Sequence, residues 1–419
     1  MCRRLSRVVC VATVALAAAG SVRAADETPQ FRVDPAHHNA IPDASLRPPL
    51  RVRWEADIGE TASNVVVAGG KVFVAGWDRV RSTLYAFDAN GQVTWAKELS
   101  TDVGDTWGLA YGDGRLFVAR IHTAYGHSGR LMALDAATGA AIWTTTVNEE
   151  YGFTAMPALA DGTVYVVGAS GGGRLYAIRA SDGMHLWVSD YMNGQDDSVP
   201  TVDANAVYLA FAGPQVYAIS RANGQTLWHY KGCCQGGGGA TGVVNGSRFY
   251  EDADAELPMV HDTATGAVLG PFIAHSVQET PPTFAGDLTI FNRGDALIAV
   301  GPDGGQRWSY ATHNPYTPLG APVAAGGYAY VGEIPREVTV LDLSNGQPVW
   351  CGKFADPAWG EPWDGPSGIY VGNGMLVMTL GYGVVALEGG GSASACFPPT
   401  DASGSQLGST GAAPTASSP

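Results

Sequence analysis

The chain has 419 residues, a formal net charge of −15 at pH 7 and 46% hydrophobic residues. Nucleic-acid affinity comes mainly from Lys and Arg that neutralise phosphates, so this acidic balance argues against a nucleic acid as a partner. No stretch reaches the roughly 20 consecutive apolar residues that a transmembrane helix needs, so we expect no membrane span.

Residues 1–24 have the features of a secretory signal peptide. Three arginines within the first seven residues precede an apolar run, residues 8–19, and small residues follow up to Ala24. Cleavage near Ala24 would remove four arginines and no acidic residue, which takes the formal charge from −15 to −19. We therefore expect a periplasmic or secreted protein, in which residues 25–49 form a lead-in to the folded region.

One sequence pattern recurs from residue 50 onward. Three clear copies span residues 84–95, 131–143 and 338–350, and each ends in Trp with a Gly four residues earlier. A degenerate copy, residues 261–270, ends in Gly instead. The end positions lie 38 to 48 residues apart, which is the spacing of propeller blades. These positions are Trp54, Trp95, Trp143, Trp187, Trp228, Gly270, Trp308 and Trp350.

Short apolar runs between these positions predict β-strands, for example residues 72–74, 116–118 and 164–167. Asn-Gly, Thr-Gly and Asp-Gly steps supply the positive φ angle that a tight hairpin turn requires. Each unit is therefore predicted to be a four-stranded antiparallel sheet with the Trp on its last strand. Because one such sheet cannot bury both faces alone, we expect the sheets to stack radially, with the tryptophans packed between blades.

The two ends of the repeat region complement each other. After Trp350 the chain adds three predicted strands between residues 368 and 387, but no fourth strand with a Trp. Residues 50–58 form such a strand around Trp54, with no strands before it. Pairing of the two pieces predicts an all-β fold over residues 50–388. This fold is an eight-bladed β-propeller of four-stranded antiparallel blades, closed by an N-terminal strand that completes the last blade.

Residues 389–419 are rich in Gly, Ser, Thr and Pro and predict a disordered tail. Beyond the signal peptide the chain has four cysteines, which allow three pairings. We favour one disulfide between the neighbours Cys233 and Cys234 and another between Cys351 and Cys396. The second would pin the tail to blade seven, near the closure point.

The pattern Ala-Leu-Asp-Ala-x-Thr-Gly-x-x-x-Trp of residues 133–143 resembles the repeat of quinoprotein (pyrroloquinoline quinone, PQQ) alcohol dehydrogenases and of their cofactor-free BamB-type relatives. The resemblance covers roughly residues 50 to 387 and implies a PQQ-like propeller. Compact blades with short loops resemble the BamB-type proteins more than the enzymes. In the enzymes a calcium ion bridges cofactor and protein, with one acidic ligand in a Gly-Ala-Glu sequence. The closest stretch here, residues 168–174, contains no acid.

Connections between blades, and between the second and third strands of a blade, converge on one face of a propeller near its axis. Ligand sites usually lie there. Aromatic rings together with a carboxylate on this face suit a sugar or polyol, and carboxylates with a histidine suit acid/base chemistry. The predicted ligand-binding residues are Trp77, Trp107, Asp197, Trp359 and Trp363. The candidate catalytic residues are Glu150, His313 and Glu361.

Two further loop features bear on function. The quinoprotein dehydrogenases place a vicinal disulfide against the cofactor, so the resemblance makes Cys233-Cys234 the best indication of an enzyme. Residues 251–256 carry four acidic side chains and predict an exposed acidic loop, without the spacing of a calcium loop. No metal site is predicted.

Three functions follow in order of preference. The first is a BamB-like binding or scaffold module of the cell envelope, monomeric, with a protein or glycan partner. The second is a PQQ- and calcium-dependent oxidoreductase acting on alcohols or sugars. The third is a polysaccharide lyase or hydrolase that uses Glu150, His313 and Glu361.

Overall fold

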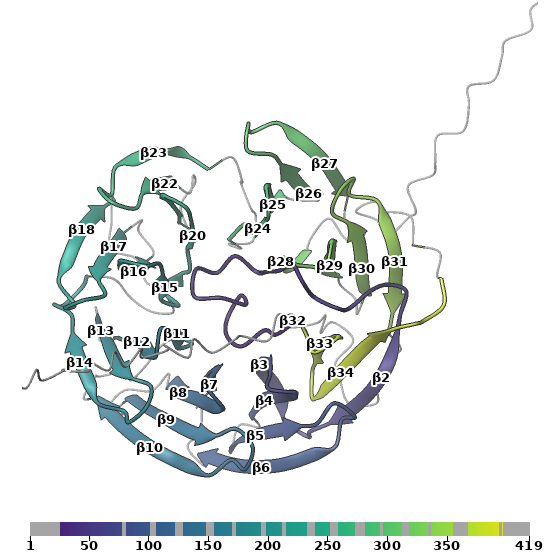
Figure 1. The fold of residues 1–419 in the computed structure, drawn as a ribbon, viewed down its shortest axis with the longest axis horizontal. Coiled ribbons are helices and arrows are strands. Elements are labelled where there is room, and N and C mark those ends of the chain that lie inside the picture. The colour runs from purple at the N-terminus through teal and green to yellow at the C-terminus, as the bar shows by residue number, and fades with distance from the viewer. Residues whose placement is uncertain are drawn as a thin grey trace, which may run out of the picture.

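The computed structural model is a closed ring of eight four-stranded antiparallel sheets around a central axis (Figure 1). No helix occurs among the residues that the structure describes, and the predicted eight-bladed all-β propeller is confirmed. The described residues are 26–77, 81–100, 106–121, 129–147, 155–169, 173–193, 198–211, 215–232, 239–251, 259–272, 281–293, 296–311, 318–333, 337–354, 368–393 and 396. The predicted signal peptide and most of the predicted tail lie outside them.

In each blade the first strand lies nearest the axis and the last strand lies at the rim. Blade 1 contains β3 (Thr61–Ala68), β4 (Lys71–Trp77), β5 (Ser82–Phe87) and β6 (Val93–Ser100). Blade 2 contains β7 (Thr106–Gly112), β8 (Arg115–Ile121), β9 (Gly129–Asp135) and β10 (Ala141–Val147). Blade 3 contains β11 (Ala158–Ala160), β12 (Thr163–Ala169), β13 (Gly173–Arg179) and β14 (His185–Val188). Blade 4 contains β15 (Thr201–Val202), β16 (Ala206–Phe211), β17 (Gln215–Ser220) and β18 (Thr226–Lys231), with β19 (Gly239–Ala240) paired to β16.

The second half of the ring repeats this arrangement. Blade 5 contains β20 (Val243–Asn245), β21 (Arg248–Tyr250), β22 (Met259–Asp262) and β23 (Val268–Pro271). Blade 6 contains β24 (Thr283–Ala285), β25 (Leu288–Arg293), β26 (Ala296–Val300) and β27 (Gln306–Ala311). Blade 7 contains β28 (Pro318–Ala325), β29 (Tyr328–Glu333), β30 (Glu337–Asp342) and β31 (Pro348–Lys353). Blade 8 contains β32 (Gly368–Gly372), β33 (Met375–Leu380), β34 (Gly383–Gly389) and, at the rim, β2 (Leu50–Asp57).

The ring closes through the pairing of β2 with β34, as the sequence predicts. The two strands are antiparallel, with Trp54 opposite Ala386 and Ala56 opposite Val384. The pairing places Trp54 in a buried cluster with residues of blades 8 and 1, including Phe87, on which its ring stacks at 5.6 Å. A strand from one end of the chain therefore supplies the rim of the blade made by the other end.

Six of the seven repeated tryptophans lie at the seams between blades and pack on the turn glycine of the next blade. The indole of Trp95, for example, covers Gly139, and its Nε1 donates a hydrogen bond of 3.1 Å to the Ala136 carbonyl. A Cβ on Gly139 would lie 2.8 Å from the ring. The glycine is thus required both for its φ of +71° and for the close approach of the indole.

Residues 26–49, called the strap below, follow a path that the sequence did not predict. Figure 1 shows them as the purple trace inside the ring. A short strand of the strap, β1 (Ala40–Ile41), pairs in parallel with β28 of blade 7. Backbone N–H groups at equivalent positions of the inner strands donate to strap carbonyls in six blades. These bonds are Val67 to Thr28, Tyr111 to Pro29, Val202 to Pro35, Val244 to Ala36, Phe284 to His38 and Ala324 to Asn39, at 2.6–3.1 Å.

The remaining two blades bind the strap through other groups. In blade 3 the Leu159 N–H donates to Oε1 of Gln30 at 2.8 Å, and in blade 8 the Asn373 N–H donates to the Asp26 carbonyl at 2.7 Å. An inner edge strand has unpaired N–H groups, which are costly to bury without a partner. The strap pairs with one such donor in each of blades 1 to 7 and with a turn N–H in blade 8.

The structure contains a disulfide between Cys351 of β31 and Cys396, the pairing expected for the tail. It closes a loop with a sequence separation of 45 residues. By the loop-entropy relation, replacing both cysteines with serine should lower the free energy of unfolding by about 4 kcal/mol. Denaturant titrations of the variant and of the oxidised parent protein measure this difference. Equal midpoints would show that the bond adds no stability.

Candidate functional site

Most of the predicted ligand-binding and catalytic side chains lie outside the described residues. This holds for Glu150, Asp197, His313, Trp359, Glu361 and Trp363, and for Cys233 and Cys234. Their roles stay predictions. Trp77 and Trp107 are described as strand residues, opposite Thr61 and Arg120 respectively. Trp77 ends β4 at the side of blade 1 remote from the strap, and its Nε1 is buried without a hydrogen-bond partner among the described residues.

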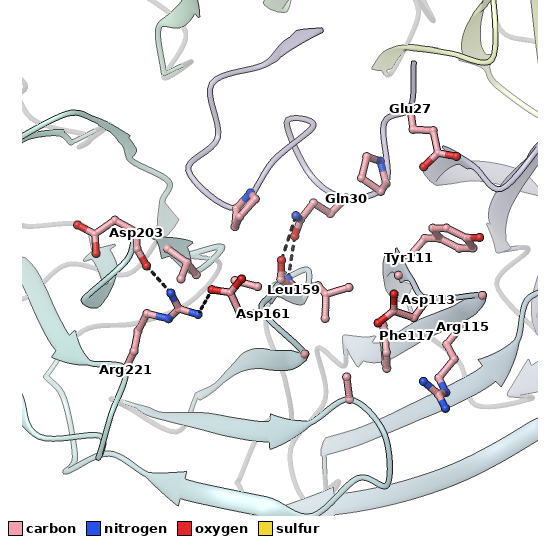
Figure 2. A pocket seen from close by; sticks show the side chains of 18 of the residues that line it. Glu27, Gln30, Tyr111, Asp113, Arg115, Phe117, Leu159, Asp161, Asp203 and Arg221 are labelled. Carbon is pink, nitrogen blue, oxygen red and sulfur yellow. Dashed lines mark hydrogen bonds and ion pairs between the residues drawn. The ribbon is translucent and has the colours of Figure 1, made fainter. Parts of the chain in front are cut away.

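The described residues form a candidate site on the opposite, strap-bearing face. A cleft of about 760 Å³ lies between the strap and the hairpin turns of blades 2, 3 and 4 (Figure 2). Its size falls within the range of roughly 300–1,000 Å³ typical of small-molecule sites. The strap contributes Glu27, Pro29, Gln30 and Pro35 to its lining. The sequence does not predict this cleft, because no pattern in the lead-in indicates that it lies against the hairpin turns of the blades.

One end of the cleft is organised by Arg221, which follows β17. Its Nη2 lies 2.8 Å from a carboxylate oxygen of Asp161, and its Nη1 donates to the Asp203 carbonyl at 2.8 Å. Its Nε donates to the Tyr165 hydroxyl at 3.1 Å. Burial lowers the pKa of Arg221, but the bonds to Tyr165 and Asp161 outweigh this and raise it above its ordinary value. The guanidinium is therefore a fixed cation that ties the hairpins of blades 3 and 4 together.

The other end of the cleft lies at blade 2. Tyr111 packs over Gly69, and burial together with the nearby Glu27 carboxylate raises the pKa of its phenol. Glu27 itself accepts a hydrogen bond of 2.8 Å from the Gly69 N–H. Arg115 also lines this end, and its buried Nε has no hydrogen-bond partner among the described residues. Figure 2 shows Arg115 beside Asp113, apart from the Arg221 cluster.

Gln30 lies between these two ends and fixes the strap to blade 3. Its amide nitrogen donates to the Leu159 carbonyl at 3.2 Å and its amide oxygen accepts from the Leu159 N–H at 2.8 Å. The pair of bonds imitates one rung of a β-ladder. The cleft thus offers carboxylates, guanidinium groups and backbone turns, which suit a polar ligand.

Buried ionisable groups also occur away from the cleft. His261 of β22 and Glu251 are both fully buried at their side chains and lie 3.2 Å apart from Nε2 to Oε2. The expected exposed acidic loop is therefore wrong for Glu251, because this carboxylate also accepts the Met259 N–H and sits inside blade 5. Among the described residues no group of three or more His, Cys, Asp or Glu is arranged to hold a metal ion.

His37 of the strap is buried between blades 4 and 5. Its Nδ1 lies 3.0 Å from the Gly242 carbonyl and 3.0 Å from the Thr201 hydroxyl, and it is 1% exposed. Burial lowers its pKa from 6.5 to about 4. The folded protein therefore holds a neutral His37, whereas the unfolded chain takes up a proton as the pH falls below 6.5.

Stability should consequently fall between pH 6.5 and pH 4, with a loss of about 3 kcal/mol attributable to His37. The neighbouring His38, whose pKa its partner Asp34 raises, contributes stability that is already complete below pH 6.5 and so does not mask the effect. We expect His37→Gln to flatten the dependence of the unfolding free energy on pH in this interval, with His38→Gln as the control. An unchanged slope in His37→Gln would contradict the assignment.

Comparison with known proteins identifies the family of this chain. Residues 80–232 and 234–362 match the family model described as outer membrane protein assembly factor BamB. The chain belongs to the BamB family. The strap and the closing strand β2 precede the matched region. None of the described residues forms a helix long and apolar enough to cross a membrane.

Similar proteins include BamB and quinoprotein enzymes. The outer membrane protein assembly factor BamB of Yersinia pestis is 25% identical over 306 residues, which are 67% of this chain and 64% of that protein. The chain thus spans less than two thirds of this relative. The structure of BamB from Moraxella catarrhalis is 18% identical with a TM-score of 0.59, covering 81% of this chain and 99% of that one. The quinohemoprotein alcohol dehydrogenase from Comamonas testosteroni is 15% identical with a TM-score of 0.65, covering 89% and 82%. Both structural likenesses show the fold alone.

Proposed function

We propose that this BamB-family chain is a binding and scaffold module of the cell envelope, exported to the periplasm, with a protein or glycan partner. The observation that carries the proposal is the family match over most of the propeller. The strap supports it, because its hydrogen bonds reach all eight blades and it covers the inner strand edges on one face. Partners would then meet the loops of the other face or the outer rim.

Among the surfaces formed by the described residues, the rim of blades 3 to 5 suits a protein partner best. Seven of the twelve large hydrophobic side chains that are exposed among the described residues belong to these three blades. They are Met184, Leu186, Val188, Tyr191, Leu227, Val268 and Leu269. Natural edge strands are commonly protected by charged side chains, as β2 is here by Arg51 and Arg53. An apolar edge favours addition of a partner strand.

Site-specific photo-cross-linking in intact cells tests the proposal. A photoreactive residue at Leu227, which is 54% exposed, should give a discrete product whose second component is an envelope protein. Val349 of blade 7 is the matched control, since it also precedes a seam Trp and is 44% exposed. Equal products from both positions, or no product from either, would contradict a protein-binding role for the blade 3–5 rim.

PQQ-dependent oxidation is a second candidate, favoured by the sequence Cys233-Cys234 and by the fold shared with a quinohemoprotein dehydrogenase. The residues do not fit the cofactor well. The β12–β13 hairpin, in which Gly168 pairs with Arg174, carries no acidic side chain that could hold calcium. We therefore derive no catalytic step through PQQ. Spectral titration of the purified protein with PQQ and calcium distinguishes the two candidates, because tight stoichiometric binding would favour the oxidoreductase.

A further inference from the structure

Six seams of the ring share one packing arrangement. At each of them the indole of one blade lies on the turn glycine of the next, so that an added Cβ would meet the ring at 2.6–2.8 Å. The pairs are Trp54 on Gly91, Trp95 on Gly139, Trp143 on Gly183, Trp187 on Gly224, Trp228 on Gly266 and Trp308 on Gly346. This arrangement defines an indole site built from a glycine turn and the adjacent sheet.

The seam between blades 5 and 6 has the same glycine but no indole among the described residues. Gly304 has a φ of +75°, within the 71–77° range of the six covered glycines. The degenerate repeat places Gly270 where the other blades have Trp, and no described atom lies within 4 Å of a Cβ built on Gly304. Gly304 is also exposed to solvent, whereas Gly139, Gly224 and Gly346 are buried. The glycine turn that would receive an indole is therefore present, but no described ring covers it.

The apolar floor of this site is also present. Across blade 2 the residues in register are Trp143, Ala133 and Phe117. Across blade 5 the corresponding residues are Gly270, Val260 and Tyr250. Val260 and Tyr250 are 8% and 9% exposed, and Tyr250 packs edge-on against Phe272 at 5.2 Å. Phe272 also contacts Phe291 of blade 6 at 5.4 Å, so its ring fills part of this seam, and the open space is the part next to Gly304. The exposed side chains of Val268 and Leu269 continue the apolar surface outward on β23.

We propose that the space over Gly304, called the seam slot below, accepts a tryptophan side chain from a partner polypeptide. The six covered seams identify the occupant, because a turn glycine of closely similar φ holds an indole each time. The closest parallel is Trp54 on Gly91, because the N–H groups of Gly91 and Gly304 each donate to the carbonyl three residues earlier, whereas the other five glycines donate to the carbonyl four residues earlier. The buried Nε1 of Trp54 has no hydrogen-bond partner among the described residues, whereas the other five indoles donate to a carbonyl of the next blade. Recognition in the seam slot therefore depends on the ring face. This inference rests on the proposed binding function in one respect, namely that the partner is a polypeptide of the cell envelope.

Purified full-length protein and N-acetyl-tryptophanamide as the probe test the seam slot. Saturation-transfer NMR should show binding with a dissociation constant in the millimolar range, and N-acetyl-leucinamide should bind more weakly. Gly304→Asn should weaken probe binding roughly tenfold, equivalent to about 1.4 kcal/mol, because Asn tolerates a positive φ while its Cβ occupies the indole position. Gly246→Asn is the matched control, since Gly246 has a φ of +61° and open space but lies away from the seams.

A second variant provides a positive control. Trp308→Ala uncovers Gly346 and should create a second binding site of the same kind, so the amount of probe bound at saturation should rise. Probe binding that Gly304→Asn leaves unchanged, or no binding by the parent protein, would overturn the seam slot. Concentration-dependent dimerisation that Gly304→Asn abolishes in sedimentation experiments would overturn the partner assignment, because a second copy would then be the occupant. Neither result bears on cross-linking at Leu227.

Discussion

A chain that lacks residues 26–57 is expected to lose its cooperative unfolding transition. The deletion removes β2 and leaves β34 as an exposed edge, and it removes Trp54 from the cluster that joins blades 8 and 1. It also removes every strap carbonyl that accepts an inner-strand N–H. Because a ring depends on each seam, opening one exposes apolar faces on two blades. Far-UV circular dichroism during urea titration measures the transition.

A shorter deletion separates the two contributions. Removing residues 26–46 takes away all but the last three residues of the strap and keeps β2, so the ring should still fold cooperatively, at a lower urea midpoint. A synthetic peptide of residues 47–58 should restore the transition when added to the longer deletion. A cooperative transition of the longer deletion at the midpoint of the full chain would show that neither segment closes the ring.

Trp54→Ala is expected to lower the free energy of unfolding by about 3–5 kcal/mol. Trp54 is 8% exposed, stacks on Phe87 and covers Gly91, so truncation leaves a cavity at the closing seam. Since its Nε1 has no hydrogen-bond partner among the described residues, Trp54→Phe should recover most of the loss. Urea titrations of the three proteins give the comparison.

Val52→Ala serves as the control on the same strand. Val52 is 44% exposed, so its truncation should change the free energy of unfolding by no more than about 0.5 kcal/mol. A similar loss for Trp54→Ala and Val52→Ala would mean that the indole does not stabilise the seam. It would also remove the basis for reading an indole site at Gly304.

The fold could be predicted from the sequence because the repeats show a clear pattern of strands, turn glycines and tryptophans. A Trp four residues after a turn Gly marks six of the eight rim strands, and the unpaired copy at Trp54 indicates which blade it completes. The pairing of Cys351 with Cys396 followed from the same reasoning about the closure point. These patterns are either local in the sequence or come from the two ends of the repeat region, which complement each other. They can be recognised without knowing where the propeller axis lies.

The strap could not be predicted, because its contacts carry no periodic sequence signal. Its residues bind mainly through backbone carbonyls, which every residue type has, and a buried histidine such as His37 has no distinctive neighbour in the sequence. The cleft near Arg221 could not be predicted for the same reason, since one of its sides is formed by strap residues Glu27, Pro29, Gln30 and Pro35. Glu251 was assigned to a solvated loop because its partner, His261, is reached only across a strand pair.

The candidate site was predicted on the loop face, and the choice of face followed from general propeller geometry. Most of its residues lie outside the described part of the chain, so that prediction stands as made. The sequence did indicate the position of the seam slot, through the degenerate repeat that ends at Gly270. Its meaning depends on the six covered glycines, whose contacts only the three-dimensional arrangement reveals.

Hydrogen–deuterium exchange of residues 26–57 in the full chain tests most directly whether this segment closes the ring both at the axis and at the rim. Peptides from β2 should exchange as slowly as peptides from β34, with which β2 shares its hydrogen bonds, and the amides that join strap and blades, such as those of Thr28, Val67 and Phe284, should also be protected. Fast exchange throughout residues 26–57, while β34 stays protected, would contradict the closure.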